Sequence, residues 1–206
     1  MLFSYYDLEL EVPESVYYPS EDSLFLCDWL LENRPKFERA IDVGCGCGII
    51  AILLAKLSRK EVDAVDVSRL AILTTRRNAK RNEVKVRAYL SDLFSNVKGS
   101  FDLIVSNPPY LPHSSEDRMV PEEVRRMWCG GKEFIERLLA GGSERLRPNG
   151  IIVFVCSTLS LNQEEVKKLA AKFGLKASIA KSTKLPWEEL FLVVVRSEEE
   201  GTEKSE

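Results

Sequence analysis

The sequence predicts an α/β fold in which a mostly parallel sheet is covered by helices on both faces. Short apolar segments alternate along the chain with longer segments of helical period, and such alternation is typical of parallel sheets. The composition, 45% hydrophobic and 30% charged residues, is that of a globular protein. A chain of 206 residues can build one sizeable core, so we expect a single domain over residues 1–196.

The N-terminal region is expected to form a strand followed by a helix. Leu8, Leu10 and Val12 alternate with acidic residues, which is the period of a half-buried strand. The segment PSEDSLFLCDWLLENRP then predicts a helix, with Ser20 as its N-cap and Pro35 beyond its end.

The alternating part of the chain supplies the sheet. Strands are predicted at residues 39–43, 61–66, 85–90, 101–106 and 151–156, and helices at residues 49–57, 68–81 and 132–147. A further helix begins at Asn162, which can form a capping box with Glu165, and ends at Gly174. Two last strands, at residues 176–180 and 191–196, are joined by a turn short enough for an antiparallel pair.

The charge balance argues against a protein that works chiefly by gripping nucleic acid. The formal net charge is −3, but residues 197–206 hold five Glu and one Lys. The rest of the chain, with 28 basic and 27 acidic residues, is nearly neutral, whereas nucleic-acid-binding domains are usually strongly basic. The terminal segment has no apolar periodicity, so we expect a disordered acidic tail over residues 197–206.

The cysteines and the N-terminus indicate the compartment. The five cysteines follow no CxxC spacing, so neither a disulfide framework nor a metal site is predicted. The N-terminus carries acidic residues in place of a basic leader, and no apolar run approaches membrane-spanning length. We expect a cytoplasmic protein.

A glycine-rich turn follows the first strand of the sheet, in the stretch AIDVGCGCGIIAILLAKL. Gly44, Gly46 and Gly48 allow the backbone to pass close beneath a ligand, and the following helix offers free N–H groups. The third glycine comes one residue earlier than in the dinucleotide fingerprint G-x-G-x-x-G. Asp42, just before the turn, would repel a phosphate and attract a cationic amine. We therefore expect S-adenosylmethionine, a zwitterionic nucleoside, as the cofactor.

Two further strands also end on an acidic residue. Asp66 closes the second strand, where a carboxylate can accept both ribose hydroxyls, and Val67 stands beside it. Asp92 follows the third strand and is placed to meet the adenine amino group, with Leu93 against the ring. Open α/β sheets bind ligands at the carboxyl ends of their strands, so the three acids agree with one cofactor site.

Plainer interpretations of these residues stay open. The glycine turn could be only a tight connection, and a strand-terminal aspartate could cap the next helix. For Asp66 that role is already filled by Ser68. Cys45 and Cys47 are interpreted as small side chains in a crowded turn rather than as redox or metal groups.

The stretch VSNPPYLP ends the fourth strand with an amide, two prolines and an aromatic ring. The prolines stiffen the backbone, so that the Asn107 side-chain oxygen and the Pro108 carbonyl can point at one guest atom. Two acceptors at such an angle suit a planar NH2 group with two donors, against which Tyr110 can stack. The alternative is a rigid loop start with Asn107 in an Asx-turn, and His113 is interpreted as incidental.

The motifs DVGCGCG, VDVS, SDLF and SNPPYLP, in this order, resemble class I S-adenosylmethionine-dependent methyltransferases of the HemK-like kind. That family methylates the glutamine side-chain amide in the GGQ loop of translation release factors. Segments like Val16–Ser23 and Trp128–Gly131 are similar to its small archaeal and eukaryotic branch. The resemblance implies a Rossmann-like, seven-stranded sheet of order 3-2-1-4-5-7-6 with the last strand antiparallel. It also implies that Asn107 and Pro108 hold the substrate amide.

The same resemblance assigns the cofactor contacts. Asp42 and Gly44 would meet the methionine part, Asp66 the ribose, and Asp92 with Leu93 the adenine.

The resemblance further implies a lid formed by residues 1–35, in which Tyr18, Pro19 and Ser23 cover the cofactor. A helix start with packing aromatics is the alternative for these three residues. Bacterial members carry an additional N-terminal substrate-binding domain, for which the residues before Asp42 leave no room.

The resemblance also suggests a partner. Relatives of this branch work with a small zinc-binding activator protein that pairs with an edge strand, for which Val84–Leu90 is the candidate. Three arginines between Leu111 and Cys129, namely Arg118, Arg125 and Arg126, could contact an acidic or RNA-associated partner or could simply be solvated.

Two other functions stay open at this point. The chain could methylate an amino group of adenine in nucleic acid or of protein lysine. It could also be a noncatalytic cofactor-binding subunit that stabilises a partner.

Overall fold

Seven strands form the central sheet of the protein, which we describe from a computed structural model for residues 1–111, 125 and 129–198. In chain order they are β3 (Ala40–Val43), β4 (Val62–Asp66), β5 (Val86–Leu90), β6 (Phe101–Ser106), β7 (Leu146–Ser157), β8 (Leu175–Lys184) and β9 (Glu189–Ser197). Across the sheet the order is β5-β4-β3-β6-β7-β9-β8, which counted from β3 reads 3-2-1-4-5-7-6. Only β9 runs antiparallel to its neighbours. The predicted α/β fold with a mostly parallel sheet is confirmed.

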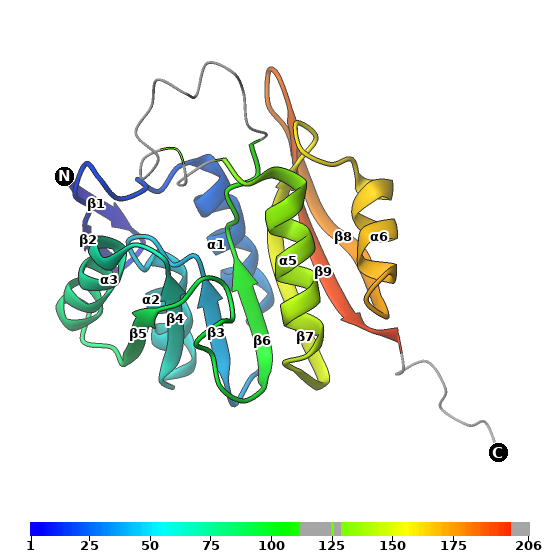
Figure 1. Cartoon of the computed structure of the whole chain (residues 1–206). Helices are drawn as coiled ribbons and strands as arrows, with labels where there is room; N and C mark the ends of the chain where they lie inside the picture. Colours follow the sequence, from blue (N-terminus) through cyan, green and yellow to red (C-terminus); the bar gives the residue numbers. More distant parts are fainter. Residues whose placement is uncertain (112–124, 126–128, 199–206) are drawn as a thin grey trace.

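Helices cover both faces of this sheet (Figure 1). One face carries α1 (Glu21–Asn33), α2 (Ile49–Ser58) and α3 (Arg69–Arg81), and the other carries α5 (Gly131–Ser143) and α6 (Gln163–Ala171). Alternate strand residues enter opposite cores: Leu103 and Val105 of β6 join the first, and Ile104 joins the second. Within the described ranges, no helix is long and apolar enough to cross a membrane.

The structure corrects two predicted boundaries. The helix predicted over residues 132–147 ends at Ser143, and Leu146 already begins β7. The spacing of Leu146 continues the helical pattern. Leu146 nevertheless belongs to the sheet, because it pairs with Phe101 of β6. Ser197, where the predicted tail begins, is still the last residue of β9, and residues 199–206 lie outside the described residues.

The starts of α6 and α1 are organised differently. Asn162 forms the predicted capping box: its Oδ1 accepts from the Glu165 amide at 3.0 Å, and the Glu165 carboxylate accepts from the Asn162 amide at 2.8 Å. Ser20 occupies the N-cap position of α1 but makes no side-chain hydrogen bond to the helix backbone. Its Oγ lies 2.9 Å from Oδ1 of Asp22, so side chains rather than a backbone cap order this first turn.

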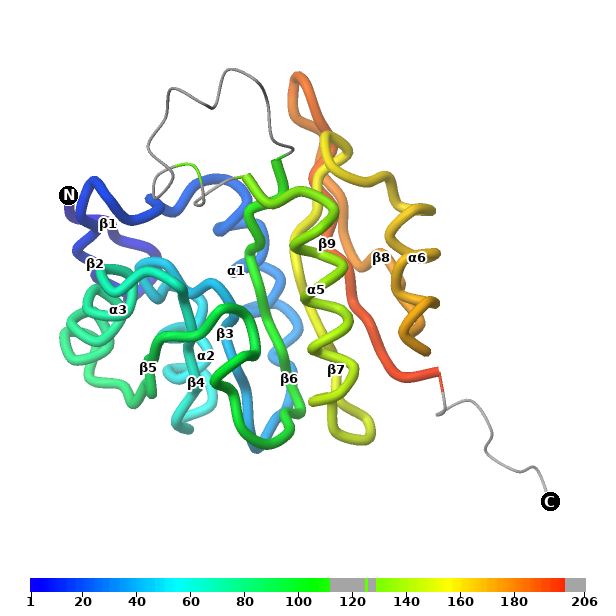
Figure 2. Tube along the Cα trace, in the orientation of Figure 1, coloured from blue at the N-terminus to red at the C-terminus, as the bar shows by residue number. Residues whose placement is uncertain are grey.

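The N-terminus forms a hairpin that sequence reasoning predicted only in part. An additional strand, β1 (Leu2–Tyr5), pairs with β2 (Leu8–Glu11) in a separate antiparallel sheet. Asn78 of α3, fully buried, accepts from the Glu11 amide at 2.9 Å and donates to the carbonyls of Glu11 and Cys47 at 3.1 and 2.9 Å. The chain after β2 crosses the end of the sheet before entering α1 (Figure 2). The hairpin is thereby tied both to α3 and to the glycine-rich turn.

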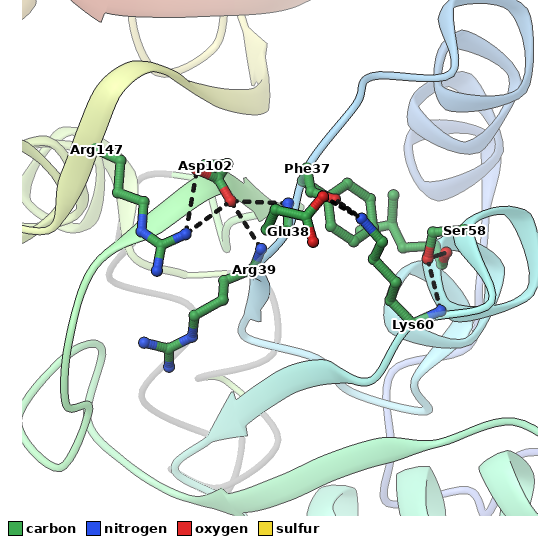
Figure 3. Close-up of polar contacts among 8 residues, drawn as sticks. Phe37, Glu38, Arg39, Ser58, Lys60, Asp102 and Arg147 are labelled. Atoms are coloured by element: carbon green, nitrogen blue, oxygen red, sulfur yellow. Dashed lines mark hydrogen bonds and ion pairs between the residues drawn. The ribbon is translucent and has the colours of Figure 1, made fainter.

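An aspartate fastens the amino ends of β3 and β6 (Figure 3). Asp102 accepts from the amides of Glu38 and Arg39 at 2.8 and 2.7 Å and from Nη1 of Arg147 at 3.1 Å. Burial works in favour of the neutral carboxyl, but the two amides and the arginine outweigh it and hold the pKa of Asp102 below its ordinary value.

We predict that Asp102→Ala lowers the free energy of unfolding by about 1–3 kcal/mol at pH 7, because two amides and a guanidinium lose their acceptor. A carboxyl with a lowered pKa stabilises the fold above about pH 4, and this contribution is lost as the pH falls through the folded pKa. Urea denaturation should therefore show the difference between the two proteins shrinking below pH 4.

Glu38→Ala is the matched control for Asp102→Ala. The Glu38 side chain is exposed and pairs only with Lys60 among the described residues, so we expect a change of about 0–1 kcal/mol. Equal losses in the two variants would contradict the role assigned to Asp102.

Candidate cofactor and acceptor site

A cavity of about 790 Å³ lies at the carboxyl ends of β3, β4, β5 and β6. Its volume is typical of small-molecule sites, on the order of 300–1,000 Å³. The predicted site residues that line it are Pro19, Ser23, Gly44, Gly46, Asp66, Val67, Asp92, Leu93, Asn107, Pro108 and Tyr110. Two others, Tyr18 and Asp42, are not among the lining residues. The cavity therefore joins four strand ends to the N-terminal segment.

The glycine-rich turn forms the floor of this cavity beside β3. Gly44, Gly46 and Gly48 have φ of +80°, +53° and +88°, in the left-handed region that favours glycine. A Cβ at Gly44 or Gly46 would meet open space, whereas one at Gly48 would come within 2.8 Å of Thr75. The first two glycines thus leave room for a ligand against the backbone, and the third allows α3 to pack.

Asp66 stands at the end of β4 with its carboxylate held in place. Its Oδ2 accepts from the Gly46 amide at 3.0 Å, and its Oδ1 accepts from the Ser68 amide at 2.8 Å. Burial raises the pKa of Asp66, and the backbone hydrogen bonds oppose that shift. A carboxylate has about four lone-pair positions, so each oxygen can still accept from a diol.

The end of β5 supplies the next side of the cavity. Leu93 is buried and has φ of +47°, an uncommon conformation for leucine, and it lines the cavity with Asp92. The Asp92 carboxylate pairs with Arg137 of α5 at 2.8 Å and stays largely exposed. An apolar surface beside an exposed acceptor is suited to a flat heteroaromatic ring with an amino group.

Asp42 is fully buried beneath the turn rather than in the cavity wall. Its Oδ2 accepts from the Ala51 amide at 3.1 Å, near the start of α2, while its Oδ1 has no partner in the described part of the chain. Burial raises the pKa of Asp42 to about 7; the Ala51 amide lowers it, and the nearby charge of Asp66 raises it. The structure shows no direct path from this carboxylate to a ligand, so its predicted contact stays a prediction.

The end of β6 holds an amide with a free oxygen. Asn107 donates from Nδ2 to Oγ of Ser23 at 3.1 Å, while its Oδ1 is buried without a partner in the described structure. An unpaired buried acceptor is costly, and each such group in a native protein requires an explanation, such as a water, an ion or a catalytic role. Asn107 lines the cavity, so the missing donor would come from a ligand.

Two glycines at the start of α5, the N-cap Gly130 and the first helical residue Gly131, pack against Pro109. The Pro109 carbonyl accepts from the Gly131 amide at 3.0 Å. A Cβ at Gly130 would lie 2.5 Å from the same carbonyl oxygen, so only glycine fits there. This explains the glycine pair of the motif at residues 128–131, of which Trp128 lies outside the described residues.

Sequence reasoning missed two residues of this site, Asp22 and Tyr17. Asp22 is buried, and both of its oxygens accept from the Tyr17 hydroxyl, at 3.0 and 2.9 Å. The Tyr110 hydroxyl lies 3.3 Å from Oδ2 of Asp22. Burial, followed by the charge of Asp22, raises the pKa of both tyrosines, so their hydroxyls stay protonated and donate. Tyr18 instead packs edge-on against Phe3.

The signal for Asp22 in the sequence was ambiguous. An acid in the first turn of a helix usually reflects the helix dipole, and nothing local reveals its burial. The tyrosine pair before Pro19 likewise gives no indication of which ring turns inward.

The cysteines of the turn are structural. Burial raises the pKa of the Cys45 and Cys47 thiols, so neither is a ready thiolate. Within the described residues, no cluster of three histidine, cysteine or acidic side chains could hold a metal ion. His113, Arg118 and Arg126 fall outside the part of the chain that the structure describes.

Comparison with known proteins identifies the family of the chain. The sequence model of the methyltransferase small domain matches residues 21–185. A Methanocaldococcus jannaschii protein, provisionally named a protein N5-glutamine methyltransferase, is 34% identical over 196 residues, covering 94% of this chain and 98% of that protein. A release factor glutamine methyltransferase of Geobacter sulfurreducens is 34% identical over 152 residues, covering 69% of this chain. This chain spans about half, 54%, of that bacterial relative.

A solved structure shares the fold. The E. cuniculi Mtq2–Trm112 complex, described as responsible for methylating the termination factor eRF1, superposes with a TM-score of 0.68 at 21% identity. The match covers 89% of this chain and 99% of that one.

We predict that Asp42→Asn stabilises the cofactor-free protein at pH 8. A carboxyl with a raised folded pKa contributes stability below its unfolded pKa of about 4, and this is lost as the pH rises through about 7. The neutral amide avoids that loss, which could reach about 4 kcal/mol at about 1.4 kcal/mol per pKa unit. Urea denaturation at pH 4 and pH 8 would measure it.

The two proteins should have similar stability at pH 4, where Asp42 is protonated. A variant that equals the wild type at pH 4 and is less stable than it at pH 8 would show that the Asp42 charge supports the fold, and would contradict the raised pKa.

Proposed function

The chain belongs to the methyltransferase small domain family, and from this we propose that it methylates the side-chain amide of a glutamine in a translation release factor. The observation that carries the proposal is the buried, unpartnered Oδ1 of Asn107 in the cavity wall. An acceptor oxygen fixed at the end of β6 suits an NH2 group. The names of the M. jannaschii and G. sulfurreducens relatives support glutamine as the carrier of that group.

The cavity fits S-adenosylmethionine as the cofactor. Gly44 and Gly46 leave open space against the backbone, Asp66 can accept from the ribose, and Asp92 with Leu93 would meet the adenine. When bound, the cofactor supplies a methyl group attached to a positively charged sulfur. Asp42 lies buried beneath the turn, and its Oδ1 has no partner among the described residues. In its ionised form, Asp42 would favour a cationic ligand above the turn.

The residues of β6 would act by orientation and electrostatics. An amide nitrogen is a poor nucleophile, so holding it in line at about 3–3.5 Å from the methyl carbon is the main contribution, worth up to about 7–11 kcal/mol in model reactions. Asn107 and the Pro108 carbonyl would also stabilise positive charge that develops on the nitrogen. Tyr110 would stack on the planar amide.

Residues 1–35 would act as a lid in this proposal. The segment after β2 lines the cavity through Pro19 and Ser23. Tyr17 also lines the cavity, in the position that we had expected for Tyr18. A release-factor substrate also agrees with the expected cytoplasmic location.

An activator partner at the free edge of the sheet is part of the same proposal. Because β5 ends the sheet, its outer side can pair with another strand. Arg76 of α3 donates to the Ala88 carbonyl at 3.0 Å, so a partner strand would have to share or displace this contact. Leu90 of β5 and Leu73 of α3, the helix that packs against β5, are 37% and 49% exposed, so a partner that covers this edge could bury them. The Trm112 subunit of the E. cuniculi complex supports such a partner, and its binding of zinc is our expectation from the resemblance.

The proposal predicts that the wild-type protein transfers labelled methyl from S-adenosylmethionine to the release factor of its own organism. Replacing the acceptor glutamine should abolish the label. Asn107→Ala should lower kcat by about 10²–10³-fold, the cost of losing one preorganised polar contact, while calorimetry still shows cofactor binding. These are the results that separate an enzyme from a noncatalytic subunit.

Other outcomes of this assay are informative. Label on adenine or lysine, and none on the release factor, would refute glutamine as the acceptor. Full activity in Asn107→Ala would remove Asn107 from the reaction.

Val86→Pro should abolish binding of the activator without unfolding the protein. Lys85 and Ser91 use their backbone groups toward β4, so by alternation the amide of Val86 faces the free edge. Proline there removes a hydrogen-bond donor that only a partner would use. Size-exclusion chromatography with the candidate activator would measure binding, and circular dichroism would measure folding.

Val86→Thr keeps the amide and serves as the control. Complex formation by the folded Val86→Pro protein would contradict edge pairing at β5.

A further inference from the structure

We propose that Asp22 and Ser23 are positioning residues that determine which end of the Asn107 amide faces the acceptor. The proposal rests on the function proposed above, since it concerns the same acceptor group. An asparagine side chain has a donor end and an acceptor end of nearly equal shape, so the scaffold must select one orientation. The hydrogen bonds around Asp22 supply that selection.

We call the hydrogen bonds that link Asp22, Ser23 and Asn107 the relay. It starts at Asp22, because an ionised carboxylate can only accept hydrogen bonds. It lies 5% exposed in the first turn of α1 and accepts from the Ser23 amide at 2.5 Å. The hydroxyls of Tyr17 and Tyr110 also point to it. Ser23 Oγ lies 3.3 Å from Oδ1 of Asp22, so the single hydroxyl proton of Ser23 is directed to the carboxylate.

The direction in which the Ser23 hydroxyl donates its proton determines the orientation of the Asn107 amide. With its hydrogen on Asp22, Ser23 Oγ offers only lone pairs, and it can then pair only with the donor end of the amide. Nδ2 of Asn107 lies 3.1 Å from this oxygen, which turns Oδ1 away from Ser23. Oδ1 of Asn107 therefore has no partner because the Asp22 carboxylate, two hydrogen bonds away, fixes the direction of the Ser23 hydroxyl.

The orientation has a chemical consequence for the acceptor. With Oδ1 outward, the site accepts from an NH2 group. If the amide were rotated, Nδ2 would face the acceptor nitrogen, and two donors would oppose each other. Through Ser23 and Asn107, Asp22 therefore determines whether the site binds a nitrogen or an oxygen as the methyl acceptor. Asp22 itself is not expected to touch the substrate.

Two variants break the relay at different points. Asp22→Asn can donate to Ser23 and so releases the Ser23 proton toward Asn107, and Ser23→Ala removes the link altogether. Ser23→Thr keeps the hydroxyl and should restore the relay. Ser20→Ala is the matched control, because Ser20 also donates to Asp22 at 2.9 Å but makes no contact with Asn107.

The first readout is independent of catalysis. In cofactor-free protein labelled with 15N-asparagine, the side-chain NH2 signals of Asn107, assigned with Asn107→Ala, should shift and exchange faster with water in Asp22→Asn and Ser23→Ala. They should stay as in the wild type in Ser20→Ala and Ser23→Thr. Unchanged signals in all four variants would overturn the proposal.

The second readout uses methyl transfer to the release factor. Asp22→Asn and Ser23→Ala should lower kcat by about tenfold, the effect of losing one oriented hydrogen bond, while Ser20→Ala stays within about twofold of the wild type. A loss confined to cofactor affinity would instead assign Ser23 to cofactor binding and overturn the positioning role. A wild-type protein that labels no release factor would refute the proposed function, whereas the spectra would still test the relay.

Discussion

The side-by-side pairing of β3 and β6 is the constraint on which the site depends. After β3 the chain builds β4 and β5 outward on one side, and then returns to place β6 on the other side, with Asp42 opposite Val105. A parallel sheet whose order reverses in this way opens a crevice at the carboxyl ends of the two central strands. The Ser106 hydroxyl donates to the Val43 carbonyl at 2.7 Å and fixes the two ends together. The glycine-rich turn and the Asn107 loop therefore face each other by topology.

The N-terminal segment lines this crevice, and polar contacts as well as the buried Leu8, Leu10 and Val12 hold it there. Asn78 holds the hairpin to α3 and to the turn. Asp22 accepts hydrogen bonds from the hydroxyls of Tyr17 in the segment and Tyr110 after β6. Asn78 and Asp22 are both buried and hydrogen-bonded, which makes each a source of specificity as well as of stability. In the proposed function, these contacts would both cover the cofactor and orient the acceptor amide.

The sequence predicted what is locally encoded. The apolar runs of β3, β4 and β6 and the capping box at Asn162 were found within a few residues, because burial on both faces and a side-chain cap leave local patterns. The predicted start of β7 at residue 151 was wrong, because Leu146 follows the helical period in the sequence but pairs with Phe101 in the sheet. Asp22 was missed because its burial, and its contact with the Tyr110 hydroxyl, arise from packing between segments that are distant in sequence. The unpaired oxygens of Asp42 and Asn107 likewise arise from tertiary packing.

A crystal structure of the protein with S-adenosylhomocysteine and a peptide that carries the acceptor glutamine would test the central claim most directly. We predict that the glutamine amide nitrogen lies about 3 Å from Oδ1 of Asn107, with Nδ2 still bonded to Ser23 Oγ. A glutamine bound elsewhere, or an Asn107 amide that turns its nitrogen toward the acceptor, would contradict it.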